Sequence, residues 1–414
     1  MIIENKKESW FNFDLANPMI MYTIIWTMSF YLYSLEITTN VIGLNLDTVL
    51  LVLGSVITFI IIYFVSYVFK ISSNKFNVSL KTPIEKFNNK IKVDYFEKIA
   101  NLLTIIWGVG SFLEVLQFGG VPIISVVVLG HYDLDYKAFG LPTIHGMLNA
   151  IYLTITVSYY IHYQITRSKK SLIKVILLSL WPILCMTRAL LLWNLIEILS
   201  VYLIFHKINF KKILGLFFSM ILVVLLFGYI GDNRGEASEV RFTDNFIKEE
   251  YREVGKQMPS GFIWVYMYLT TPINNVAWNV DKLHPAYDFN FTTSALIPSV
   301  IRDKIFVGGA KYPIILYQET FNVSSYFASY MGDFGVNGAL IFVCFIQIAI
   351  TQIYFSAKSN KLGSIVAYAT IFNSVMMSVF FDFFFSLVTI FQVMLGFFIN
   401  YLLYSKSKKQ HVQG

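Results

Sequence analysis

The chain has 414 residues, of which 56% are hydrophobic, 17% aromatic and only 14% charged. Soluble domains carry about 25% charged residues, so this composition, with its long apolar stretches, excludes an ordinary soluble protein. The net charge of +7 would suit nucleic-acid binding, but the placement of the basic residues indicates membrane topology instead. The two cysteines, Cys185 and Cys344, lie in apolar stretches and exclude a disulfide framework or a zinc cluster.

Ten stretches have about the 20 apolar residues that a membrane-spanning helix requires. They are residues 18–36, 47–69, 99–118, 143–164, 171–187, 189–206, 213–231, 335–357, 361–381 and 383–404. The fifth and sixth are short and almost fused at Thr187-Arg188. Two further apolar segments are predicted to be re-entrant or interfacial, because 121–130 is too short to cross and 261–280 is interrupted by threonine, proline and asparagine.

Most of the 32 basic residues lie on alternate loops, as the positive-inside rule predicts for the cytoplasmic side. Both termini are therefore predicted to be cytoplasmic. The one long loop, residues 232–334, is predicted to lie on the opposite side. We expect an all-α polytopic membrane protein with about ten transmembrane helices, forming a single integral membrane domain over residues 1–414.

The long loop contains three informative patterns. Residues 239–256 have apolar side chains at near-helical spacing, which predicts a helix on the membrane surface or, alternatively, a lid over a lipid-borne substrate. Residues 264–275 are rich in Tyr, Trp and Asn; such aromatics anchor proteins at the interface, and they can also stack on sugars while Asn binds hydroxyls. Asp333 precedes the eighth span, where helix capping and a functional role both fit.

Several ionisable residues interrupt the apolar stretches or face the outer side. Arg188 is the most unusual, because charge at membrane depth is costly and tends to be functional; snorkelling to the interface is the alternative. Glu114 and Glu197 also lie within apolar stretches and are expected either to pair with a basic group or to relay protons. His145 and His284 are each a possible base or an ordinary polar surface residue.

Common enzyme signatures for nucleotide, metal or serine chemistry are absent from the sequence. The cytoplasmic loops are short and rich in lysine, whereas the polar functional groups gather in the outer loops. We therefore expect chemistry on a substrate already delivered across the membrane, anionic and lipid-linked, with no required metal or cofactor and no nucleic acid as a partner.

The chain resembles the O-antigen polymerases, the Wzy-type oligosaccharide repeat-unit polymerases of bacterial surface polysaccharide pathways. The resemblance covers the architecture of most of the chain and three local patches. These patches are Thr187-Arg188 before Ala-Leu-Leu-Leu, Tyr268-x3-Pro272-x2-Asn275, and Asn322-x-Ser324-x-Tyr326 running to Asp333-Phe334-Gly335-x2-Gly338. The Arg-Gly pair of the family is kept only in part, because Ala189 follows Arg188 and Arg234-Gly235 supplies such a pair elsewhere.

The resemblance implies a GT-C-like membrane glycosyltransferase of the bacterial inner membrane, acting at the periplasmic face. Its reaction transfers a growing glycan from undecaprenyl pyrophosphate to a sugar hydroxyl of the next lipid-linked repeat unit. The implied partners are undecaprenyl-pyrophosphate-linked glycans, the lipid bilayer and a chain-length regulator.

Pyrophosphate is a good leaving group, so such an enzyme needs mainly cations for the diphosphate and a base for the attacking hydroxyl. Arginine suits phosphate because its donors form a planar fork. The predicted pyrophosphate ligands are Arg188 and Arg234, with Arg241 and Arg302 as weaker candidates. The predicted base is Asp333 or Glu319, followed by His284 and Asp232. The predicted sugar-binding residues are Tyr268, Asn275, Asn322 and Tyr326.

Two other classes of protein remain alternatives at this point. A lipid-linked oligosaccharide flippase or other transporter would need polar residues distributed through its spans. An O-antigen ligase or membrane acyltransferase would share the architecture, and a ligase would also share the lipid donor but use a different acceptor.

Overall fold

The computed structural model is almost entirely helical in the part of the chain that it describes, and the predicted all-α fold is confirmed. The described residues are 14–39, 41–72, 90–130, 139–206, 211–215, 218, 221, 224–225, 242–305, 315–318, 322–359 and 361–413. Within them, β-type pairing is limited to an isolated bridge between Thr38 and Ile247.

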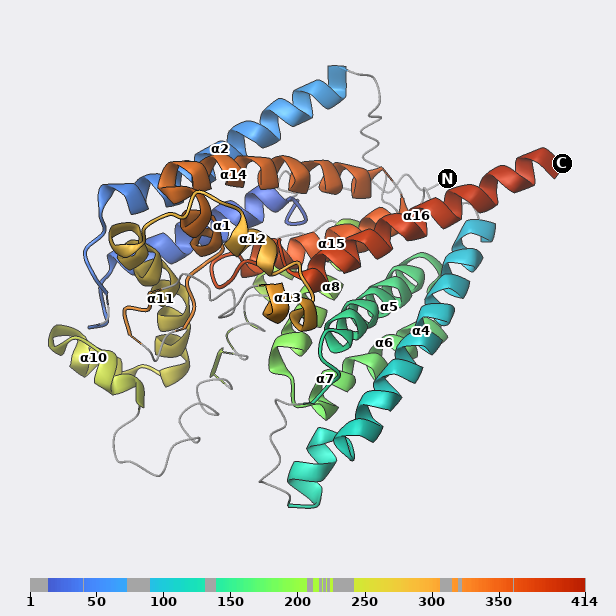
Figure 1. Ribbon diagram of the computed structural model, residues 1–414, viewed down its shortest axis with the longest axis horizontal. Helices are drawn as coiled ribbons and strands as arrows, with labels where there is room; N and C mark the ends of the chain where they lie inside the picture. The colour runs from blue at the N-terminus through green and yellow to red at the C-terminus, as the bar shows by residue number, and fades with distance from the viewer. Residues whose placement is uncertain are drawn as a thin grey trace, which may run out of the picture.

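Most of the helices pack side by side in a bundle, with α10 and α11 at one side of it (Figure 1). The bundle helices are α1 (Pro18–Ser34), α2 (Leu46–Ser72), α4 (Lys90–Phe118), α5 (Ile144–Thr166), α6 (Lys169–Ser179), α7 (Trp181–Leu184), α8 (Arg188–Phe205), α14 (Phe327–Lys358), α15 (Leu362–Met377) and α16 (Leu387–Gln413). The other elements are the π-helix η1 (Ile124–Val128), the 3₁₀-helices η3 (Phe242–Phe246) and η4 (Glu249–Tyr251), α10 (Arg252–Gln257), α11 (Ser260–Lys282), α12 (Asn290–Ser294) and α13 (Ser299–Ile305).

Helix α15 joins two groups of helices. It packs against α1 and α14 on one side and against α5 and α8 on the other, with α16 alongside it. Most residues of α5 and α15 are buried, whereas α2 and α4 carry many exposed apolar side chains. Because most of their residues are buried, α5 and α15 form the centre of the bundle. The exposed apolar surface lies on the peripheral helices, as is expected where helices contact lipid.

Among the described residues, five helices are long and apolar enough to cross a membrane: α2, α4, α8, α14 and α16. Helices α1 and α15 are apolar but have 17 and 16 residues, and the predicted fifth span is divided into α6 and α7, with a break before Trp181. The predicted seventh span, 213–231, lies mostly outside the described residues. The structure therefore supports a membrane protein, and the ten-span topology stays a prediction.

The lysine-rich connections meet at one end of the bundle. The Lys406 ammonium lies 6.0 Å from the ring centre of Tyr95, which joins the end of α16 to the start of α4. Lys70 at the end of α2 lies 4.4 Å from the Phe355 ring of α14. These segments, which the positive-inside rule places on one side of a membrane, therefore share one end of the fold, called here the basic end; the opposite end is the outer end.

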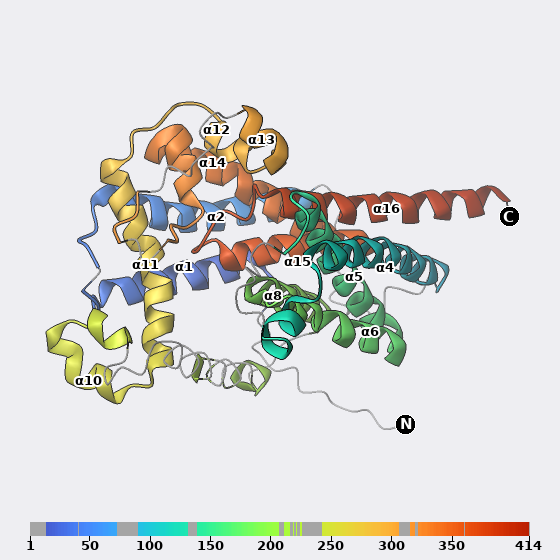
Figure 2. The same ribbon diagram turned by 60° about the horizontal axis from the view of Figure 1, so that its bottom comes forward.

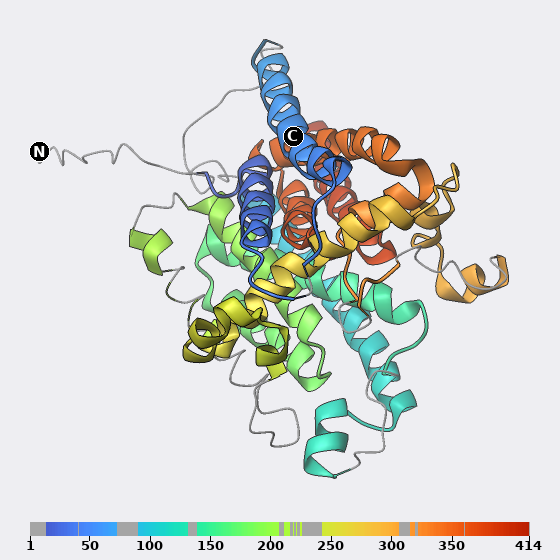
Figure 3. The same ribbon diagram turned by 90° about the vertical axis from the view of Figure 1, so that its left-hand side faces the viewer.

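Helix α11 is one continuous helix of 23 residues with Pro272 in its interior, so the threonine, proline and asparagine residues do not divide it. Its re-entrant or interfacial position stays a prediction. The hydroxyls of Thr270 and Thr271 donate to the carbonyls of Tyr266 and Met267 at 2.9 and 2.8 Å, so both polar side chains are bonded within the helix. The helix runs across the outer end, steeply inclined to α1 and α2 (Figures 2 and 3).

The predicted amphipathic helix over 239–256 is wrong, because its described part is divided into η3, η4 and α10. The break falls at Ile247, which pairs with Thr38 in the isolated bridge and is buried. Lys248 then bonds to Glu36 at 3.0 Å. Tertiary contacts with the loop after α1 thus override the helical spacing of the apolar residues.

Helices α15 and α16 approach each other closely at two glycines. A Cβ added to Gly396 would lie 2.6 Å from the carbonyl oxygen of Gly363, and one added to Gly363 would lie 2.1 Å from the carbonyl oxygen of Gly396. Small residues permit such backbone contact between apolar helices. The Asn400 side chain bridges the same interface, accepting from the Gly363 N–H at 2.9 Å and donating to Ser364 at 2.7 Å.

We predict that Gly396→Val separates α15 from α16 and lowers stability, because overpacking a close interface costs about 1–3 kcal/mol or more. The measurement is the thermal midpoint of the detergent-purified protein. Gly108→Ala on α4 is the control, since a Cβ there meets nothing within 4 Å and replacing a helical glycine gains up to about 1 kcal/mol. Equal midpoints for the two variants would contradict the packing described.

Candidate functional site

The structure describes eight of the twelve residues predicted to form the site. The other four, Asp232, Arg234, Arg241 and Glu319, lie outside the described residues, and their roles stay predictions.

Arg188 is the first residue of α8 and is exposed. The chain reverses just before it, with Met186 at φ 57°, and the Thr187 hydroxyl is directed to the Pro182 carbonyl at 3.3 Å rather than to the helix. Among the described residues, no carboxylate lies within ion-pair distance of Arg188. A guanidinium without a counterion therefore lies beside backbone N–H groups that lack a side-chain cap, which favours an anion there.

The Asp333 side chain has a different partner from the one predicted. Helix α14 begins at Phe327 and has a non-helical residue, Gly335 (φ 70°), at a kink that separates two helical segments. Asp333 lies at the end of the first segment, just before the second, as predicted, but its side chain does not cap that segment. Its carboxylate is fully buried and accepts from the N–H groups of Phe291 and Thr292 at 2.9 and 2.8 Å. Asp333 therefore caps α12, a short helix of the outer loop.

The chain around His284 meets the same kink. His284 follows α11 and is exposed; the Ala286 N–H donates to the Gly332 carbonyl at 2.8 Å, and Pro285 packs near Gly335. The structure thus brings His284 and Asp333, two predicted base candidates, to one region, with His284 at the surface and Asp333 beneath α12.

The predicted sugar-binding residues divide by burial. Asn275 and Tyr326 are buried. The Asn275 side chain accepts a hydrogen bond from the Tyr317 N–H and donates one to the Val323 carbonyl. The Tyr326 hydroxyl bonds to that of Tyr22 at 2.6 Å. Tyr268, beside Trp264 on α11, is 43% exposed, and Asn322 is exposed. Surface contact with a sugar is therefore open to Tyr268 and Asn322.

Arg302, the remaining predicted anion ligand, lies near the end of α13 and is partly exposed. The Trp193 ring of α8 lies 5.1 Å from that of Phe383, in the turn between α15 and α16.

Sequence reasoning missed Asp382 in this turn. It is buried, and its carboxylate accepts from the N–H of Phe384 at 3.0 Å. Burial raises the pKa of Asp382 from its usual 3.8 to about 7, and hydrogen bonds from Tyr330 and the turn backbone limit the rise. A lone carboxylate between two long apolar stretches was the available signal.

Glu114 and His145 form a pair near the outer end of α4. The Nδ1 atom of His145 lies 3.0 Å from the buried Glu114 carboxylate, and the Leu141 N–H donates to the same oxygen at 3.1 Å. The expectation that Glu114 pairs with a basic group is confirmed. Glu197, deep in α8, accepts instead from the Gln392 amide at 2.7 Å.

Comparisons with protein-family models, curated proteins and solved structures found no match.

We predict that Asp333→Ala destabilises the protein, because each buried N–H left without a partner costs about 1–3 kcal/mol. Asp333→Asn should be milder, since one acceptor oxygen remains. The measurement is the thermal midpoint in detergent. If Asp333→Ala kept the wild-type midpoint, the capping role would be contradicted.

A second prediction concerns pH. The folded protein holds a proton on Asp382 that the unfolded chain releases between pH about 4 and 7, so stability should fall as pH rises through this window and level off above it. Asp382→Asn does not titrate and should flatten the dependence. Thermal midpoints across this window test the prediction, and an unchanged slope in Asp382→Asn would refute it.

Proposed function

We propose that this chain polymerises oligosaccharide repeat units carried on undecaprenyl pyrophosphate, in the manner of the O-antigen polymerases that it resembles. In this proposal it is a bacterial inner-membrane glycosyltransferase with about ten spans, a GT-C-like arrangement and both termini in the cytoplasm. The outer end of the bundle faces the periplasm, where the lipid-linked substrates are available and a chain-length regulator could engage.

The observation that carries the proposal is the state of Arg188. It is an exposed guanidinium at the start of a candidate membrane-spanning helix, with no counterion among the described carboxylates. A pyrophosphate at the membrane surface would supply the missing charge and accept two hydrogen bonds from the fork. The first-turn N–H groups of α8 add donors to the same anion.

The chemistry needs one further group. The sugar hydroxyl oxygen attacks the anomeric carbon of the donor glycan, the bond from that carbon to the pyrophosphate oxygen breaks, and the hydroxyl proton passes to a base. His284 is the exposed candidate base beside the α14 kink. Asp333 positions α12 instead, because both its oxygens are engaged; Glu319 and Asp232 remain candidates outside the described residues.

Deletion of the gene in its host tests the proposal. Polymer-length analysis of surface glycan on a gel should show a single repeat unit in place of a ladder. Loss of all repeat units would favour a flippase, and long polymer retained on the lipid carrier would favour a ligase; either result contradicts polymerisation.

Complementation with point variants tests the site. Arg188→Ala should abolish the ladder at normal protein level, and Arg188→Lys should restore it only in part, because lysine keeps the charge but loses the fork. Arg252→Ala is the matched control: this exposed arginine also lies in the outer region but is already paired with Glu249 at 2.7 Å. A normal ladder from Arg188→Ala would refute the pyrophosphate assignment.

A further inference from the structure

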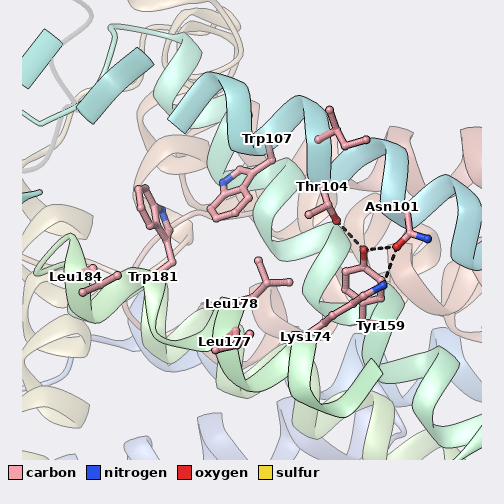
Figure 4. A pocket seen from close by; sticks show the side chains of 10 residues that line it. Asn101, Thr104, Trp107, Tyr159, Lys174, Leu177, Leu178, Trp181 and Leu184 are labelled. Atoms are coloured by element: carbon pink, nitrogen blue, oxygen red, sulfur yellow. Dashed lines mark hydrogen bonds between the residues drawn. The ribbon is translucent and has the colours of Figure 1, made fainter. Parts of the chain in front are cut away.

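A groove lies on the side of the bundle, between α4 on one wall and α6 and α7 on the other (Figure 4). Its volume is about 490 Å³, within the usual range of small-molecule sites. Its apolar lining consists of Ile105, Trp107, Leu177, Leu178, Trp181 and Leu184. The Trp107 and Trp181 rings meet edge to face at 5.3 Å and are the aromatic part of this lining.

The groove opens onto an apolar surface. Ile105 and Leu177 on its rim are 65% and 62% exposed, and the outward faces of α4 and α6 continue with exposed aliphatic side chains on both sides. Helix α4 is also a candidate membrane span. A cavity that opens onto such a surface is accessible from the hydrocarbon of a bilayer, so its occupant is expected to be a lipid chain rather than a water-soluble molecule.

The other end of the groove is polar. Lys174 donates to the Asn101 side-chain oxygen at 2.8 Å, and the Tyr159 hydroxyl donates to the same oxygen at 2.8 Å and also meets Thr104 (Figure 4). The Asn101 amide N–H groups have no partner among the described residues. Hydrogen-bond donors therefore lie where the apolar lining ends. This arrangement suits an amphiphile whose head group carries acceptor oxygens.

Two lysines extend this polar end toward the basic end of the bundle. Lys98 precedes Asn101 by three residues on α4, and Lys170 precedes Lys174 by four on α6, so each lies on the same helix face as a groove residue, one turn away. Both are exposed, and neither is paired with a described carboxylate. Glu97 lies 3.6 Å from Lys174 and balances that charge, which leaves Lys98 and Lys170 as the uncompensated cations.

We propose that this groove binds one acyl chain of an anionic phospholipid, with the phosphate between Lys98 and Lys170. The chain lies along the apolar lining toward Trp107 and Trp181, and the ester oxygens meet Asn101 and Lys174. The charge at the mouth selects an anionic head over a zwitterionic one. The polar end of this site faces the basic end, whereas its apolar end reaches α7, which precedes Arg188 in the chain. The proposal does not depend on the reaction proposed for the outer end.

Quenching by brominated lipid tests the proposal, because bromine on an acyl chain quenches tryptophan only at close contact. The full chain is reconstituted in phosphatidylcholine vesicles containing a low mole fraction of either brominated phosphatidylglycerol or brominated phosphatidylcholine. The tryptophan fluorescence that comes from the groove is the part of the emission that a Trp107→Phe/Trp181→Phe variant loses. Brominated phosphatidylglycerol should quench this part several-fold more strongly than brominated phosphatidylcholine.

The lysines provide matched variants. Lys98→Gln/Lys170→Gln should remove the preference for phosphatidylglycerol, whereas Lys169→Gln/Lys361→Gln, which removes the same charge elsewhere at the basic end, should keep it. Equal quenching by the two lipids, or an unchanged preference in Lys98→Gln/Lys170→Gln, would overturn the proposal. Displacement of brominated phosphatidylglycerol by added polyprenyl phosphate would also overturn it, since the groove would then belong to an isoprenoid chain.

Discussion

The outer end of this bundle depends on the amide side chains of α11. Loops that close an apolar bundle carry backbone N–H and C=O groups that lose water, and each must find a partner. Asn274 supplies one: its side-chain oxygen accepts from the Ile42 N–H at 2.8 Å and from the Tyr33 hydroxyl at 2.9 Å. A single buried amide thus fixes the end of α1 and the path toward α2.

Another face of α11 holds the segment before α14. Asn279 both accepts from the Ile315 N–H and donates to the Ile315 carbonyl, at 2.9 and 2.8 Å, as a neighbouring β-strand would. Asn275, one turn earlier, accepts from the Tyr317 N–H at 3.0 Å. These contacts set the approach to α14, whose kink brings Asp333 under α12 and leaves His284 at the surface. Chemistry proposed for this end therefore relies on a helix that contributes few reactive groups itself.

The helices of the bundle were largely predictable, because long apolar stretches report burial or lipid contact directly. The outer end was not, because its determinants are partners distant in sequence. Asn275 could be interpreted equally as a sugar ligand or as a backbone partner, and only its contact with Tyr317 decides which the fold uses. Asp333 was expected to cap the helix that follows it, but its carboxylate accepts from the N–H groups of Phe291 and Thr292 in α12 instead. For Arg188, the sequence indicated a charge within an apolar stretch near the start of a span. The structure adds that this residue is exposed.

Hydrogen exchange measured by mass spectrometry tests the role of α11 most directly. In Asn274→Ala, the amide of Ile42 loses its acceptor, and its exchange should accelerate about tenfold, because a net hydrogen bond contributes about 1 kcal/mol or slightly more. Asn274→Asp keeps the acceptor oxygen and should keep most of the protection. Unchanged exchange at Ile42 in a folded Asn274→Ala protein would contradict the conclusion that α11 holds the outer end together.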